Sequence, residues 1–313
     1  DESRIRVLPV GLANQIAAGE VVERPGSVVK ELIENALDAG ATTIRVDVEE
    51  GGERLIRVSD NGSGMNSKEA RIAFERHATS KIRSVEDLGA IATLGFRGEA
   101  LPSIAAVAKV VLRTREPTAE TATEVRVEGG THGATREVGG PPGTAVEVHD
   151  LFYNTPARKK FLKSVQSEAA HCTDAVIRAA LAHPEVSFRL WRDGKLVKEF
   201  SRVSGVDLRA REILGGEDLY AAQGGSDGVS VTAYLGGPER ARAGAGALYT
   251  FVNGRPVRDR ALLRAIATAY GSVLQHGRYP AGVVLLEMEP RAVDVNVHPQ
   301  KSEVRFAHHR AVY

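Results

Sequence analysis

The sequence predicts an α+β protein: a two-layer sandwich with helices on one face of a mixed, mostly antiparallel sheet, followed by a smaller α/β domain. Three observations predict it. An apolar stripe at helical spacing runs through residues 27–40, several segments alternate apolar with polar side chains, and 313 residues exceed what one hydrophobic core usually fills. We therefore expect a first domain over residues 1–203 and a second over residues 204–313.

The composition excludes several classes of protein. Hydrophobic residues make up 42% of the chain, and the formal net charge of +1 gives no global attraction to nucleic acid, so any basic surface has to be local. Cys172 is the only cysteine, which excludes an internal disulfide and is typical of a reducing compartment. The sequence shows no membrane-spanning apolar run and no signal peptide, so we expect a cytoplasmic protein without membrane contacts.

The helix predicted over residues 27–40 carries the first candidate site. Ser27 is expected to cap its start and Gly40 to end it. The face opposite its apolar stripe gathers four polar side chains at helical offsets: Glu31, Glu34, Asn35 and Asp38. Oxygen ligands grouped in this way suit a hard cation such as Mg²⁺, although a solvated acidic face would show the same pattern.

The segments that follow are expected to form a hairpin and two ligand-binding loops. Residues 43–48 and 55–59 alternate as paired strands around the Gly51-Gly52 turn. The second strand ends in residues 60–65, a loop whose glycines can take positive φ and admit close approach of a ligand. A helix over residues 68–77 follows, and residues 93–101 place paired glycines around an aromatic and an arginine, as a hinge would.

The rest of the chain completes both domains. Residues 107–148 alternate as strands, most clearly over 109–113 and 144–148, and a helix over 165–182 with strands over 187–191 and 197–200 closes the first domain before a boundary at 202–206. The second domain is expected to contain a helix over 208–214, strands over 229–234, 248–252 and 283–288, and a helix over 260–270. Residues 236–246, rich in Gly, Ala and Arg, are expected to be disordered.

Several segments of the first domain together indicate a nucleoside triphosphate as ligand. The acidic helix face can hold a metal, the loop over residues 60–64 can admit a planar group, and residues 79–81 with 95–99 can surround phosphates. A P-loop enzyme is excluded, because the chain contains neither G-x-x-x-x-G-K-[ST] nor a strand-linked G-x-G-x-x-G.

These motifs resemble those of a known superfamily. Residues 31–40 (ELIENALDAG), 60–65 (DNGSGM) and 95–101 (GFRGEAL) look like the three nucleotide motifs of the gyrase, chaperone, histidine kinase and MutL ATPases. Signatures of the MutL branch, the DNA mismatch-repair proteins, are similar to residues 77–81, 154–158, 251–255 and 294–301. The resemblance covers nearly the whole chain in order, and it implies a second domain of the ribosomal-protein-S5-like type.

The resemblance implies roles for the matching residues. Glu31 is expected to orient or deprotonate the attacking water, Asn35 to bind Mg²⁺, and Asp60 to accept a hydrogen bond from the adenine amino group. Lys301, from the second domain, is expected to reach the γ-phosphate. The other residues expected to bind ATP are Gly62, Gly64, Thr79, Ser80, Lys81, Gly95, Phe96, Arg97, Gly98, Glu99, Ala100, Leu101 and Thr144. Taken singly, Asp60 could be only a turn former, Thr144 only a strand residue and Lys301 only a solvated charge.

The resemblance also implies macromolecular partners. Arg255, Arg258 and Arg260 cluster in a loop that leads into a helix, and such local charge favours contact with single- and double-stranded DNA without sequence preference. A second basic cluster contains Lys159, Lys160 and Lys163, and it is a weaker candidate for DNA contact. Further partners implied are a mismatch-recognition protein of the MutS type and a second copy of the chain, joined through the N-terminal region when ATP is bound.

The resulting hypothesis is a DNA mismatch-repair ATPase. Slow, Mg²⁺-dependent hydrolysis of ATP to ADP and phosphate would drive N-terminal dimerisation and clamp closure on DNA. One alternative is the ATPase region of a type II DNA topoisomerase subunit, against which residues 295–301 argue. The other is a non-catalytic, nucleotide-gated DNA-binding module, against which Glu31, Asn35 and Lys301 argue. In a bacterium we expect the protein in the cytoplasm, associated with the nucleoid.

Overall fold

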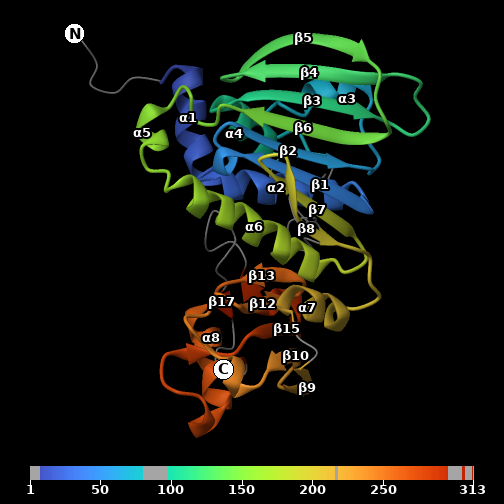
Figure 1. Cartoon of the computed structure of the whole chain (residues 1–313). Helices are drawn as coiled ribbons and strands as arrows, with labels where there is room; N and C mark the ends of the chain where they lie inside the picture. Colours follow the sequence, from blue (N-terminus) through green and yellow to red (C-terminus); the bar gives the residue numbers. More distant parts are fainter. Residues whose placement is uncertain (1–7, 80–97, 216–217, 295–304, 307–311, 313) are drawn as a thin grey trace. The chain divides into compact units, whose positions relative to one another are not determined.

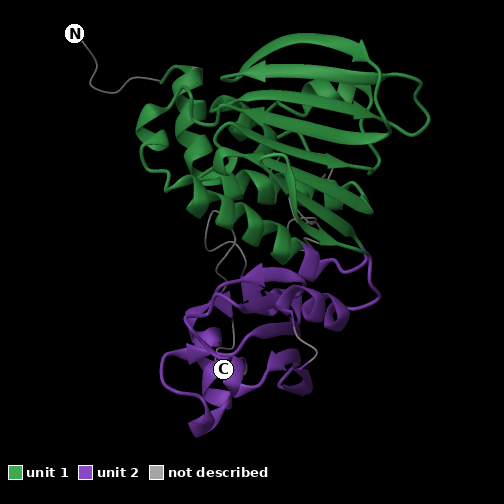
Figure 2. Ribbon diagram, viewed as in Figure 1, with its two compact units in different colours: residues 1–179, 186–201 green, residues 180–185, 202–313 purple. Residues whose placement is uncertain are grey.

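The computed structural model describes residues 8–79, 98–215, 218–294, 305–306 and 312. The chain divides into two compact units (Figure 2). Unit 1 contains residues 1–179 and 186–201, and unit 2 contains residues 180–185 and 202–313. None of the described helices is long and apolar enough to span a membrane.

Unit 1 is organised around an eight-stranded sheet with the order β5-β4-β3-β6-β2-β1-β7-β8 (Figure 1). Its strands are β1 (Thr43–Glu49), β2 (Leu55–Asp60), β3 (Lys109–Arg115), β4 (Ala122–Glu128), β5 (Thr131–Val138), β6 (Gly143–His149), β7 (Ser187–Arg192) and β8 (Lys195–Phe200). Every neighbouring pair is antiparallel except β1 and β7, which run parallel. The predicted mixed, mostly antiparallel sheet is confirmed.

Helices cover one face of this sheet (Figure 1). They are α1 (Val10–Val21), α2 (Pro25–Asp38), α4 (Ala100–Ala106) and α6 (Val165–Ala182). Unit 1 also contains two short helices, α3 (Ser67–Ile72) and α5 (Pro156–Lys159). Helices α2 and α4 pack on the strands, α1 packs on α4, and Gly26 of α2 lies so close to His171 of α6 that a side chain would be crowded. The buried members of the strands alternate as predicted; in β1 they are Ile44, Val46 and Val48.

Two predicted helix boundaries in unit 1 are wrong. Helix α2 begins at Pro25, and Ser27 is buried inside the helix instead of capping it, because Pro25 suits the first helical position. Gly40, with φ +74°, follows the helix as predicted. Helix α3 ends at Ile72, well before the predicted end at His77, whose φ of +62° is incompatible with an α-helix.

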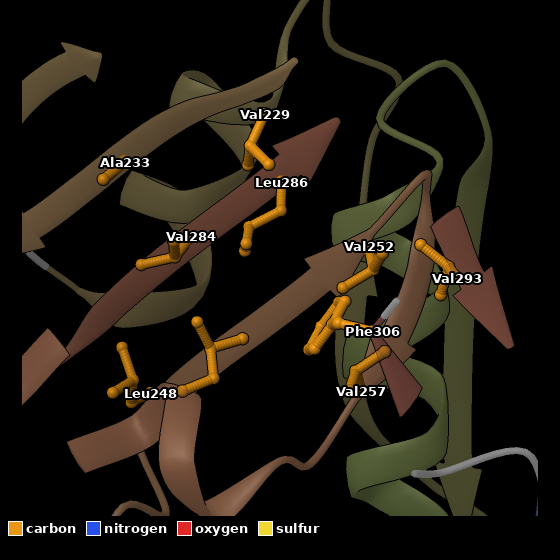
Figure 3. Packing of buried hydrophobic residues seen from close by; sticks show 10 residues of the cluster. Val229, Ala233, Leu248, Val252, Val257, Val284, Leu286, Val293 and Phe306 are labelled. Carbon is orange, nitrogen blue, oxygen red and sulfur yellow. The ribbon is translucent and has the colours of Figure 1, made fainter. Parts of the chain in front are cut away.

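Unit 2 is built on a five-stranded sheet with the order β13-β12-β15-β10-β9. Its main elements are α7 (Val206–Leu214), β9 (Leu219–Ser226), β10 (Val229–Gly236), β12 (Leu248–Val252), β13 (Arg255–Val257), α8 (Arg260–Ala269) and β15 (Gly282–Met288). Strand β12 pairs parallel to β15, with α8 between them in the chain, as in a β-α-β crossover. Figure 3 shows the buried cluster that holds unit 2 together, with Val252, Leu286 and Phe306 among its members.

The structure of unit 2 differs from the sequence prediction in two places. Strand β9 was not predicted, because its Ala- and Gly-rich sequence has low strand propensity; it is held against β10 by the Asp227-Gly228 turn, in which both residues have positive φ. The segment 236–246 was expected to be disordered. It contains a short 3₁₀ turn at Pro238–Arg240 and the strand β11 (Arg242–Ala243), which pairs with β14 (Arg278–Tyr279), a partner distant in sequence.

Candidate nucleotide-binding site

The candidate site is centred on the carboxylate of Asp60, the last residue of β2. Asp60 Oδ1 accepts hydrogen bonds from the N–H groups of Gly62 at 2.8 Å and Thr144 at 3.3 Å. Burial raises the pKa of Asp60 to about 6, and the two N–H donors offset this effect only in part. Both bonds end on Oδ1, so within the described part of the chain Oδ2 keeps its capacity to accept a hydrogen bond from a ligand.

The glycines after Asp60 are required by the protein backbone around them. A Cβ atom at Gly62 would lie 2.8 Å from the carbonyl oxygen of Ala39, and one at Gly64, where φ is +65°, would collide with the carbonyl oxygen of Arg115. The Ser63 N–H donates to the Ala39 carbonyl at 2.9 Å. The loop is therefore pressed between the end of α2 and the end of β3, which fixes the position of Asp60.

A pair of threonines supports the same loop from the sheet. Thr114 Oγ1 lies 3.0 Å from Thr144 Oγ1 and accepts a hydrogen bond from the Met65 N–H at 2.9 Å. Sequence reasoning identified Thr144 but missed Thr114, which is buried. The available signal was the alternation in β3, which places Thr114 on the same face as Val110 and Leu112, where a polar side chain needs a partner.

Asn61 was also missed, although it holds the loop to β1. Its Oδ1 accepts hydrogen bonds from the N–H groups of Thr42 and Thr43, both at 2.9 Å, and its Nδ2 donates to the hydroxyl of Thr42. An Asn between Asp60 and Gly62 is a common turn residue, so its sequence signal pointed to local structure and not to this longer-range contact.

Helix α2 presents Glu31 and Asn35 one turn apart on a partly exposed face. The C-terminal end of this helix touches the Asp60 loop through Ala39, so both side chains are carried by an element fixed to the loop. The described residues contain no group of three or more His, Cys, Asp or Glu able to hold a metal. The amide oxygen of Asn35, on the same helix face as Glu31, is of the ligand type that Mg²⁺ takes.

The structure also brings together residues 77–79 and 98–101, which include the described parts of the two segments expected to surround phosphates. Gly98, with φ +60°, lies so close to Ala78 that a Cβ atom would be 2.5 Å from its carbonyl oxygen, and His77 Nδ1 lies 3.7 Å from Glu99 Oε1. Thr79 adjoins this contact, and Ala100 and Leu101 begin α4. The other predicted residues, Ser80, Lys81, Gly95, Phe96, Arg97 and Lys301, lie outside the described residues.

The predicted DNA-contact residues all lie in unit 2. Arg255 begins β13 and is half-buried, whereas Arg258 and Arg260 are exposed. Asp259 caps α8 by accepting a hydrogen bond from the Leu262 N–H at 2.7 Å, so the two exposed arginines flank an ordered helix start.

Comparison with known proteins gives two family matches along the chain. Residues 23–152 match a family described as histidine kinase-, DNA gyrase B-, and HSP90-like ATPase. Residues 216–313 match a family described as DNA mismatch repair protein, C-terminal domain. The first match contains α2 and the Asp60 loop, and the second contains the sheet of unit 2.

Curated relatives and solved structures agree with these matches. DNA mismatch repair protein MutL of Anaeromyxobacter sp. (strain K) is 53% identical over 99% of this chain and 52% of its own length, and the MutL of Syntrophotalea carbinolica is 50% identical over 99% and 50%. The chain thus spans about half the length of these relatives. Among solved structures, the Aquifex aeolicus MutL ATPase domain complexed with ADP is 32% identical, with a TM-score of 0.64 over 86% of this chain and 94% of that domain. The N-terminal domain of a DNA repair protein gives a TM-score of 0.80 at 25% identity, over 96% of this chain and 94% of that one.

Replacing Asp60 with Asn is expected to stabilise the nucleotide-free chain at about pH 8, by up to about 3 kcal/mol before solvent screening. The folded-state pKa of Asp60 is raised from 3.8 to about 6, so the folded state favours the protonated form and the wild type loses stability as pH rises between these values. Thermal unfolding at about pH 8 and pH 5, with the exposed Asp218→Asn as control, checks this. An unfolding temperature that rises equally at both pH values would contradict it.

Proposed function

Because this chain belongs to the MutL family of DNA mismatch repair proteins, we propose that it hydrolyses ATP and uses the Mg²⁺-dependent reaction to close a clamp on DNA. Asp60 carries the proposal. Its partly buried carboxylate, whose Oδ2 receives no hydrogen bond from the described residues, suits the amino group of adenine and disfavours guanine, which has a carbonyl at that position. Membership of the MutL family rules out the alternative of a topoisomerase subunit.

The proposed mechanism assigns one task to each part of the site. Asp60 accepts from the adenine amino group, with Thr144 and Thr114 supporting the contact, and Glu31 orients the attacking water. When bound, Mg²⁺ would be held by Asn35 and phosphate oxygens and would supply positive charge to the phosphates. The segments 79–81 and 95–101 would surround the phosphates, and Lys301 would reach the γ-phosphate from the second unit.

Replacing Glu31 with Ala is expected to lower ATP turnover at least about 100-fold while ATP affinity stays within about twofold, because the carboxylate acts on water and not on the bound nucleotide. Steady-state turnover and equilibrium binding, measured in parallel with Mg²⁺ varied, check this. Glu120→Ala, an exposed glutamate of the same unit, is the matched control. Full turnover in Glu31→Ala would remove Glu31 from the mechanism. Binding without turnover in the wild type would favour the non-catalytic module.

An apolar stripe on the N-terminal segment supports ATP-induced dimerisation. Leu12 and Ile16 lie four residues apart in α1, Leu8 lies two residues before the helix, and the three side chains are 45%, 58% and 48% exposed. Side chains of this size seldom line one helix face without a partner surface. We propose that a second copy of the chain covers this stripe when ATP is bound.

Replacing Leu12 and Ile16 together with Glu is expected to keep the chain monomeric in the presence of a non-hydrolysable ATP analogue, whereas the wild type becomes a dimer. Desolvating two carboxylates at an apolar interface opposes association, while the nucleotide site stays intact. Sedimentation velocity with and without the analogue checks this. Leu208→Glu, on an exposed leucine of α7, is the control. A wild type that stays monomeric with the analogue would refute ATP-induced dimerisation of this chain.

The double substitution Arg258→Glu with Arg260→Glu is expected to weaken single-stranded DNA binding at least about tenfold at low salt and to leave ATP binding unchanged, because phosphate contacts depend on local positive charge. Fluorescence anisotropy over a salt series checks this. Arg242→Glu with Arg291→Glu makes the same change of charge at exposed positions of unit 2. If both pairs weaken binding equally, the effect comes from net charge and not from this loop.

Two further predictions follow from the family. We propose that a mismatch-recognition protein of the MutS type delivers the signal that this chain relays to repair factors. We also propose that the protein works in the cytoplasm, associated with the nucleoid.

A further inference from the structure

Helix α2 contains one cation, Lys30, and that cation lies beside Glu31. Lys30 Nζ lies 2.9 Å from Glu34 Oε1 and 3.4 Å from Glu31 Oε1. The three side chains are shielded from solvent, with exposed fractions of 29% for Lys30, 13% for Glu34 and 22% for Glu31. One ammonium group is therefore shared between two carboxylates, since its three donors can serve both.

Helix stability does not explain this arrangement. Lysine placed four residues before glutamate is the less favourable order for an ion pair on a helix, and adjacent residues such as Lys30 and Glu31 do not face each other on a regular helix. Holding the Lys30 side chain against both carboxylates costs side-chain entropy. A contact with this cost suggests a role beyond holding the helix.

Burial and two neighbouring carboxylates determine the charge state of Lys30. Burial alone would lower the pKa of Lys30, but Glu34 and Glu31 outweigh that effect and raise it, so the ammonium stays charged. Among the described residues, this balance includes no charged group of β1, β2, α4, α6 or the 3₁₀ turn Glu50–Gly52, the elements packed on α2. Without Lys30, the carboxylates of Glu31 and Glu34, three residues apart on one helix face, would repel each other.

We propose that Lys30 is a positioning residue for ATP hydrolysis, which holds the Glu31 carboxylate in the orientation that activates water while Glu34 anchors the ammonium. The inference rests on the proposed function, because it concerns the same carboxylate. It adds Lys30 and Glu34 as residues that act through Glu31.

The test compares Lys30→Met and Glu34→Gln with wild type at saturating ATP. Lys30→Met is expected to lower kcat about tenfold with the ATP affinity unchanged, because Glu31 loses its orientation. Glu34→Gln is expected to lower kcat as well, because the Lys30 ammonium group loses the carboxylate that anchors it. Lys30→Arg should recover most of the turnover, and Lys195→Met, an exposed lysine of β8, is the control.

The outcomes separate this inference from the proposed function. If the wild type turns over ATP and Glu31→Ala does not, but Lys30→Met and Glu34→Gln keep the wild-type kcat, the role of Lys30 is refuted and the ATPase stands. If Lys30→Met lowers kcat and ATP affinity together, or if Lys30→Arg does not recover turnover, the role is also refuted, because a general loss of structure would give both results. If the wild type shows no turnover, both proposals fall. Thermal unfolding and ATP binding establish that each variant is folded, and Glu34→Gln carries the test if Lys30→Met does not fold.

Discussion

The candidate site depends on one buried carboxylate held by two backbone N–H groups. Asp60 can occupy its position only because the β2–β6 register places it opposite Thr144 and because Gly62 folds back toward it. Burying the carboxylate is unfavourable, as its raised pKa shows. A ligand that donates a hydrogen bond to Oδ2 would offset part of that cost, which favours ligands that carry a donor at this position.

Helix α2 links this carboxylate to the proposed reaction. Its C-terminal end is fixed to the Asp60 loop through Ala39, and its partly exposed face carries Glu31 and Asn35 one turn apart. A shift of the loop would therefore move the residues proposed to act on water and metal. The contact between Lys30 and Glu31 adds to this arrangement, because a residue of the same helix restrains the Glu31 carboxylate. Recognition of the base and activation of water would thus share one rigid element.

Local features of the sequence predicted much of the fold and of the site. The polar face with Glu31 and Asn35 follows from helical spacing, and the β1–β2 hairpin follows from alternation around Gly51-Gly52. The features that the sequence did not predict depend on contacts between segments that are distant in sequence. Thr114 matters because Met65 and Thr144 reach it, and residues 236–246 are ordered because β11 finds β14. Ser27 failed for a local reason, since Pro25 competes for the start of the helix.

The selectivity of the nucleotide site tests the central claim most directly. Competition calorimetry with ATP and GTP, in the presence of Mg²⁺, measures how the Asp60 carboxylate discriminates between an amino group and a carbonyl at the same ring position. The account predicts that GTP binds at least about 100-fold more weakly than ATP, because two acceptors would face each other in a buried site. Equal affinity for the two nucleotides would contradict the assignment of Asp60 and, with it, the site built around that residue.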